Sequence, residues 1–150
     1  MAKVLVTGGC GFIGSHTLVS LINNGYDVIS IDDNSRSTTQ TLDGVEAITG
    51  VKVKNYKVDL CDFDKTAAVF EENPDISGVI HFAAYKSVME SVSVPLMYHR
   101  NNLNGLLNIL ECIKKYNVKS FVFSSSCSVY GNIETLPVTE DTPFKEAECP

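Results

Sequence analysis

Three glycines near the start of the chain have the spacing of a phosphate-binding turn. Gly8, Gly11 and Gly14 lie between a short β-branched run and a segment with helical periodicity. In such a turn the first glycine allows a tight bend, the second lets the backbone approach a pyrophosphate, and the third lets helix and strand pack closely. The helix that follows offers unpaired N–H groups and a partial positive charge to phosphates. The pattern predicts dinucleotide binding; the alternative, a merely tight strand–helix turn, needs only one of the glycines.

A carboxylate follows the second apolar run of the chain. Asp32 stands 18 residues after the last of these glycines, where an acidic side chain accepts hydrogen bonds from the adenosine ribose. A 2′-phosphate there would meet a like charge, so the sequence favours NAD over NADP. Arg36 weakens this preference, because an arginine can accommodate the phosphate. Asp33 has a second interpretation, as a solvated loop charge.

These residues must be positioned by the elements around them, and the chain alternates short apolar runs with longer segments of helical periodicity. The predicted strands cover residues 4–6, 28–31, 51–58, 79–82 and 121–123. The predicted helices cover residues 13–24, 65–72 and 95–116, with a loop and a short helix within residues 33–50. This alternation is typical of the α/β class, a doubly wound, Rossmann-like parallel sheet with helices on both faces. We expect the third strand to lie near the sheet edge. We also expect the leucines that share one face of residues 95–116 to belong to the core; they are Leu103, Leu106, Leu107 and Leu110.

Several later segments carry a family resemblance. They are residues 58–60 (VDL), 81–92 (HFAAYKSVMESV), 98–102 (YHRNN) and 123–131 (FSSSCSVYG). Together with the GxxGxxG spacing, they resemble the extended short-chain dehydrogenase/reductase family and, within it, the UDP-glucose 4-epimerases. The lysine of the second segment and the triple serine of the last distinguish those epimerases from the dehydratases and decarboxylases of the same fold.

The resemblance implies an NAD cofactor and a UDP-sugar substrate. The intact enzyme would interconvert UDP-glucose and UDP-galactose by NAD-mediated hydride transfer through a 4-keto sugar, and would be a homodimer. Ser126 is implied as the catalytic residue that hydrogen-bonds the sugar 4-hydroxyl, and Lys86 as a second substrate contact. Each also has a structural interpretation, since serines after a strand often turn the backbone and most lysines lie on the surface. With the turn and the loop after Asp32, the residues expected to contact NAD are Gly8, Gly11, Phe12, Ile13, Gly14, Asp32, Asp33, Asn34, Ser35, Arg36, Ser37, Asp59, Leu60, Phe82, Ala83, Ala84, Lys86, Asn101 and Ser124.

The YxxxK motif that supplies the family's proton acceptor is missing from these 150 residues. Residues 148–150 resemble the stretch that precedes it. We therefore expect residues 1–150 to be the NAD-binding Rossmann domain of a longer enzyme, truncated before the last strands and inactive without its substrate domain. Three alternatives stay open: another nucleotide-sugar epimerase or dehydratase, a non-catalytic NAD-binding module, and a structural or oligomerising fragment without cofactor.

Composition narrows the possible partners and compartment. The chain is 44% hydrophobic and 20% charged, with a net charge of −6 that argues against a nucleic-acid partner. It has no apolar run of the roughly 20 residues that a membrane span needs, and Gly8 comes too early for the apolar region of a signal peptide. Five cysteines without a CxxC pair indicate reduced thiols and a cytoplasmic protein, and three scattered histidines argue against a metal site.

Overall fold

A single parallel sheet forms the centre of the molecule, a computed structural model that describes residues 2–131, 133 and 136–143. The strand order is β3-β2-β1-β4-β5, and each neighbouring pair is parallel. The strands are β1 (Lys3–Thr7), β2 (Asp27–Ile31), β3 (Lys54–Tyr56), β4 (Ile76–His81) and β5 (Ser120–Phe123). The order reverses between β1 and β4, and ligands of doubly wound sheets bind at such a reversal. The predicted α/β fold is confirmed.

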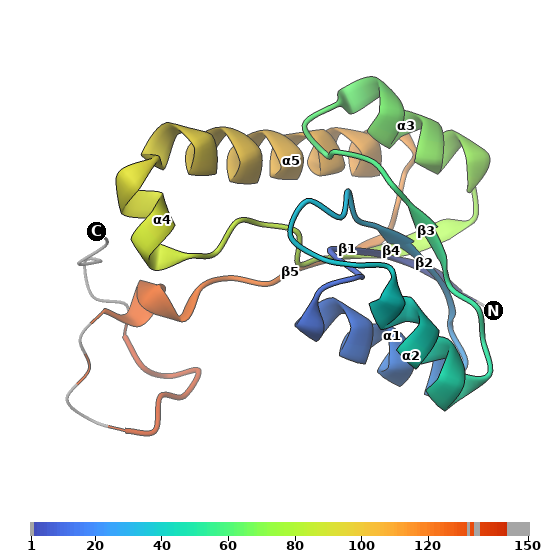
Figure 1. Cartoon of the computed structure of the whole chain (residues 1–150), viewed down its shortest axis with the longest axis horizontal. Coiled ribbons are helices and arrows are strands. Elements are labelled where there is room, and N and C mark those ends of the chain that lie inside the picture. The colour runs from blue at the N-terminus through green and yellow to red at the C-terminus, as the bar shows by residue number, and fades with distance from the viewer. Residues whose placement is uncertain (1, 132, 134–135, 144–150) are drawn as a thin grey trace.

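Helices cover both faces of the sheet (Figure 1). α1 (Phe12–Asn23) and α2 (Gln40–Thr49) lie on one face, and α3 (Phe63–Glu72) and α5 (Pro95–Lys115) on the other. The short helix α4 (Val88–Ser93) precedes α5, and a 3-10 turn, η1 (Cys127–Tyr130), follows β5. Within the described part of the chain, none of these helices has both the length and the apolar character needed to cross a membrane.

The alternation of side chains along β1 divides the core into two layers. Leu5 is fully buried against the α3 and α5 side, with Phe70 and Ile109. Val4 and Val6 point to the opposite face and pack with residues of α1 and α2. Because both faces of these strands are buried, their sequences read as continuous apolar runs.

Two expectations about the elements need correction. β3 is confirmed as an edge strand, but its pairing covers only three residues because the chain turns away after Tyr56, where the Val58 N–H bonds the Tyr56 carbonyl at 2.9 Å. The prediction that the α5 leucines belong to the core is wrong for three of them. The helix turns Tyr98, Gly105, Ile109 and Cys112 inward, and it leaves Leu103, Leu107 and Leu110 exposed.

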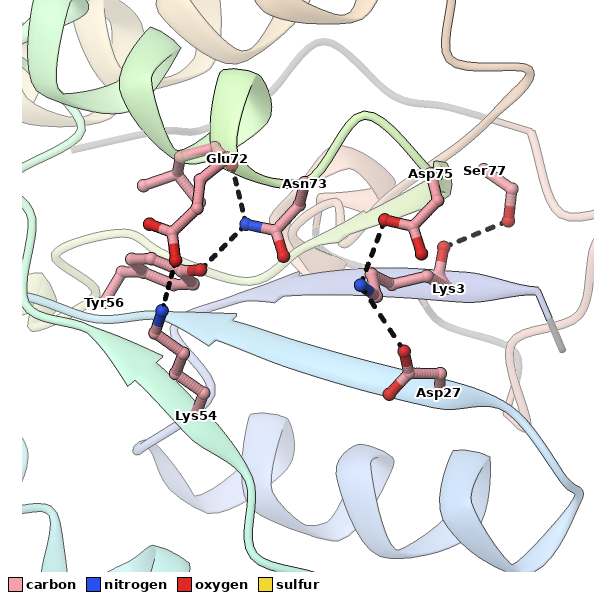
Figure 2. Close-up of polar contacts among 9 residues, drawn as sticks. Lys3, Asp27, Lys54, Tyr56, Glu72, Asn73, Asp75 and Ser77 are labelled. Atoms are coloured by element: carbon pink, nitrogen blue, oxygen red, sulfur yellow. Dashed lines mark hydrogen bonds and ion pairs between the residues drawn. The ribbon is translucent and has the colours of Figure 1, made fainter.

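Polar contacts fix the amino ends of the strands, on the sheet edge opposite the glycine turn (Figure 2). The Lys3 ammonium, at the start of β1, lies 3.5 Å from Asp27 of β2 and 3.0 Å from Asp75, which precedes β4. The Ser77 hydroxyl donates to the Lys3 carbonyl at 3.0 Å. These contacts join the three central strands at their amino ends. The loops that follow the strands lie at the opposite, carboxyl ends.

Candidate functional site

The glycine turn joins β1 to α1 and packs against the segment that follows β4. Gly8 has φ +72°, and a Cβ there would lie only 3.0 Å from the Ala83 nitrogen. A Cβ on Gly14 would overlap the Gly8 carbonyl oxygen, which explains the third glycine of the pattern as a close helix–strand contact. Gly9, which the spacing did not single out, is also required, because a Cβ there would collide with the Ser30 side chain.

The start of α1 has the properties of an anion-binding site. Its N-cap residue is Gly11, no side chain in the described part of the chain caps the helix, and its first turn contains no acidic residue. A Cβ on Gly11 would meet only the Gly8 carbonyl, at 3.2 Å, so the backbone is open on its outer side. The N–H groups of the first helical turn have no intrahelical partner. Phe12 and Ile13 are exposed beside them, which gives the site an apolar rim.

Asp32 links the glycine turn to the loop after β2. Its Oδ2 accepts the Cys10 N–H at 3.0 Å, and its Oδ1 accepts the Asn34 N–H at 3.0 Å and the Ser37 hydroxyl at 2.7 Å. The carboxylate is half-buried, and its fixed position beside the turn suits recognition of ribose hydroxyls. Asp33 accepts hydrogen bonds from the backbone N–H and the hydroxyl of Ser35.

A buried network holds the segment after β4 against the turn. The Thr7 hydroxyl accepts the Ala83 N–H at 3.3 Å and lies 2.8 Å from Nδ1 of His81. His81 is almost fully buried, and burial lowers its pKa to about 4. Its imidazole is therefore neutral at pH 7 and shares a hydrogen bond with the Thr7 hydroxyl through Nδ1.

The helix α5 supports two of the site segments from behind. Asn102 forms two hydrogen bonds with the backbone of Tyr85, accepting its N–H at 2.8 Å and donating to its carbonyl at 3.0 Å. Asn108 donates to the Leu60 carbonyl at 2.8 Å, and a Cβ on Gly105 would press on Leu60 at 3.3 Å. Sequence reasoning missed these three supporting residues. Their partners lie 17 or more positions away along the chain, so a local pattern carries no signal for them.

The residues expected to contact NAD or substrate gather at the carboxyl edge of the sheet. Gly8, Asp32, Phe82 and Ser124 each directly follow a strand, Asp59 follows β3 by three residues, and Asn101 lies on α5. Ser35, Arg36, Asp59, Ala84, Lys86, Ser124 and Ser126 are exposed; Asn34, Ser37, Phe82, Ala83 and Asn101 are half-buried; Leu60 is buried. The Ser124 N–H bonds the His81 carbonyl at 3.2 Å, which places the serines beside the β4 segment. Their chemical roles stay predictions.

A second acidic residue, Glu90 of α4, was not predicted to belong to the site. Its carboxylate bonds the Arg36 guanidinium at 2.9 Å and the hydroxyl of the buried Tyr98. Arg36 also lies over the Tyr85 ring, 4.8 Å from its centroid. The hydrogen bond from Arg36 lowers the pKa of Glu90. The pattern Ser87-x-x-Glu90 could have revealed α4, because it is the signature of a helix start.

The described residues include no group of three or more histidine, cysteine or acidic side chains that could hold a metal ion. Cys10, Cys61, Cys112 and Cys127 are not in disulfides. Residues 148–150, which were compared with the stretch before YxxxK, lie outside the described residues.

Comparisons with known proteins agree on one group of enzymes. The family model described as GDP-mannose 4,6 dehydratase matches residues 5–149. The UDP-glucose 4-epimerase of Bacillus subtilis is 50% identical over 141 residues, which are 94% of this chain and 41% of that protein. The chain thus spans well under half the length of this relative.

Solved structures give the same result. The UDP-glucose 4-epimerase from Bifidobacterium longum, in complex with NAD+ and UDP, matches with a TM-score of 0.89 and 50% identity. The match covers 95% of this chain and 42% of the epimerase chain. The UDP-glucose 4-epimerase from Stenotrophomonas maltophila, with bound NAD and formylated UDP-arabinopyranose, matches with a TM-score of 0.89 and 38% identity. The match covers 97% of this chain and 43% of that chain.

Proposed function

Because the chain belongs to the GDP-mannose 4,6 dehydratase family, we propose that it is the N-terminal, NAD-binding part of a UDP-glucose 4-epimerase. The observation that carries the proposal is the uncapped start of α1 beside the fixed Asp32 carboxylate. The identity of 50% with the Bacillus subtilis epimerase supports the choice of reaction.

The described residues fit the cofactor. The open backbone at Gly11 and the start of α1 would hold the pyrophosphate, and Asp32 would bind the adenosine ribose. Asp32 carries a negative charge and accepts hydrogen bonds, so it suits the hydroxyls of NAD and repels the 2′-phosphate of NADP. Phe82, which is half-buried and directly follows β4, provides apolar surface at the same sheet edge.

The chain's own residues would position the sugar. When bound, the dinucleotide supplies a hydride acceptor and donor for the carbon that bears the 4-hydroxyl. Ser126 lies past the end of β5 and would hydrogen-bond this hydroxyl, helping its proton to leave. Lys86 follows β4 and would contact both substrate and cofactor. None of the six tyrosines has a lysine four residues later, so the proton acceptor would come from outside these 150 residues.

An assay of the longer protein that contains this chain tests the reaction. We expect it to interconvert UDP-glucose and UDP-galactose, and Ser126→Ala to slow this by about 100-fold or more, the usual contribution of a positioned proton-transfer group. Ser125→Ala is the matched control and should keep most of the rate. An unchanged rate in Ser126→Ala would reject the assigned role. NAD binding without interconversion would favour a non-catalytic module.

A second candidate is another nucleotide-sugar enzyme of the same family. It is favoured by the dehydratase description of the family model and by the UDP-arabinopyranose derivative in the Stenotrophomonas maltophila structure. Supplying UDP-glucose and UDP-N-acetylglucosamine side by side and identifying the products would distinguish the two. A 4-epimer of glucose supports the first candidate, and loss of water from the sugar supports the second.

The proposal includes a homodimer and a cytoplasmic location. The dimer is supported by the apolar side chains that α5 exposes, Leu103 at 54% and Leu107 at 58%. The cytoplasm is supported by the thiols of Cys10, Cys61, Cys112 and Cys127, which reducing conditions would keep unpaired.

A further inference from the structure

Arg36 is the single basic residue between Asp32 and Gly50, so it is the only cation of this loop that could neutralise a 2′-phosphate. In the structure, the Arg36 side chain points to residues outside this loop. Its guanidinium bonds Glu90 at 2.9 Å and lies over the Tyr85 ring. These partners belong to the segment after β4, so the arginine reaches from one side of the site to the other.

The position of Glu90 is itself fixed. In a Ser-x-x-Glu start the glutamate side chain normally turns back to the N-cap backbone. Here only half of that arrangement forms, a long 3.4 Å bond from the Glu90 N–H to the Ser87 hydroxyl. The carboxylate instead divides its two oxygens between Arg36 and Tyr98. Tyr98 is 7% exposed on α5, so the long helix anchors the glutamate that holds the arginine.

Within this loop, the side chains that the structure describes in the hydrogen-bond network of Asp32 are neutral. Asn34 donates to Ser37 at 3.1 Å, and Ser37 donates to Asp32 at 2.7 Å. These neutral groups orient the carboxylate but do not offset its charge. Discrimination against a 2′-phosphate therefore depends on Asp32 repelling it and on Arg36 being held away.

We propose that Glu90 is a specificity-determining residue that makes the site select NAD over NADP by holding Arg36 against Tyr85. It is a positioning residue, because it acts through Arg36 and not by touching the cofactor. This inference rests on the proposed NAD-binding function.

The test is calorimetric titration of the chain with NAD and with NADP, comparing the ratio of the two dissociation constants. Glu90→Gln removes the charge while its amide oxygen can still accept from Tyr98. We expect this substitution to strengthen the binding of NADP relative to that of NAD by about five- to ten-fold, because a released guanidinium can pair with a phosphate. Glu111→Gln removes an exposed charge from the far part of α5 and should leave the ratio unchanged.

Arg36 variants show whether the effect passes through the arginine. Arg36→Gln alone should leave the ratio unchanged, and the double variant Glu90→Gln/Arg36→Gln should lose the five- to ten-fold gain. An unchanged ratio in Glu90→Gln, or a gain that persists without Arg36, would overturn the inference while NAD binding stands. A loss of NADP binding in Arg36→Gln alone would overturn it too, and this measurement does not need Glu90→Gln to fold. If the unsubstituted chain binds neither cofactor, the proposed function fails together with the inference.

Discussion

At the level of single residues, Asp32 combines a structural and a binding role. Three hydrogen bonds from its own chain fix both oxygens, one from the glycine turn and two from the following loop. Each carboxylate oxygen can accept more than one hydrogen bond, so the residue can still receive ribose hydroxyls. Among the described residues, the neighbouring Asp33 has hydrogen bonds to Ser35 alone.

This difference predicts unequal effects of two identical substitutions. Asp32→Asn should weaken NAD binding by about ten-fold or more, since hydrogen bonds to a charged acceptor are worth roughly 1.5–3 kcal/mol. Asp33→Asn should change the affinity by less than about two-fold, and it controls for the loss of one negative charge. Titration calorimetry checks both. Equal losses in the two variants would mean that Asp32 does not recognise the ribose specifically.

The buried His81 predicts how stability depends on pH. Its pKa is about 4 in the folded chain, against 6.5 for an unperturbed histidine, because burial disfavours the charged ring. Below pH 6.5 the unfolded chain takes up a proton that the folded chain refuses. The stabilising contribution is therefore complete above pH 6.5 and is lost as the pH falls towards 4, by about 3 kcal/mol in all.

Urea unfolding between pH 7 and pH 5 measures the slope of the free energy of unfolding against pH. His81→Gln should flatten the slope in that interval, whereas His16→Gln, which changes an exposed histidine, should leave it unchanged. A slope that survives in His81→Gln would assign the pH dependence to other groups.

The sequence predicted the glycine turn and Asp32 because these residues lie close together along the chain. The glycine spacing and Asp32 stand at fixed offsets from one strand–helix junction, so a pattern can reveal them. Asn102 and Glu90 could not be assigned in the same way, because their partners Tyr85 and Arg36 come near only when separate strands align in the sheet.

At the level of elements, the junction of β1 and α1 is the most constrained part of the fold. Gly14 sits in the first turn of α1, directly against the Gly8 carbonyl. The approach is backbone against backbone, so no side-chain rotation can relieve a clash. The helix start must stay this close for its N–H groups to point at a ligand that the turn holds.

Two glycine-to-alanine substitutions should therefore have opposite effects on the free energy of unfolding. Gly14→Ala should destabilise the chain by roughly 1–3 kcal/mol, the usual cost of overpacking. Gly44→Ala, inside α2 with open space around its Cα, should stabilise it by about 0.5–1 kcal/mol. Urea denaturation measures both. A neutral Gly14→Ala would show that the turn can relax and does not fix the helix start.

Helix α5 shows where periodicity is ambiguous. Its existence and ends were predicted within one residue, because Pro95 opens it and the apolar pattern continues to Ile113, close to the last helical residue, Lys115. The choice of buried face was wrong, because the helix buries Tyr98, Gly105, Ile109 and Cys112, and none of these is a leucine. Gly105 is buried where the helix approaches Leu60, and Asn108 bonds the Leu60 carbonyl. Leucine content alone does not identify that face.

At the level of the whole molecule, neither layer of the core buries a row of apolar side chains on α5. Leu103, Leu107 and Leu110 recur at helical spacing and remain exposed. The proposed homodimer would bury this row. The paired substitution Leu103→Lys/Leu107→Lys should shift the longer protein from dimer to monomer in analytical ultracentrifugation, because charges at the core of an interface are strongly unfavourable.

The matched control is Ile48→Lys on α2, which is 71% exposed and outside that row. It should leave the sedimentation unchanged. A dimer that persists in the paired variant would place the interface elsewhere.

The most direct test of the account is whether NAD stabilises this chain against unfolding. A ligand that binds only the folded form at 100 times its dissociation constant adds about 2.7 kcal/mol. We expect NAD to raise the free energy of unfolding in this way, Asp32→Asn to lose about half of the gain or more, and nicotinamide mononucleotide, which lacks the adenosine, to give little. An unfolding curve that millimolar NAD does not move would contradict a dinucleotide site at the glycine turn.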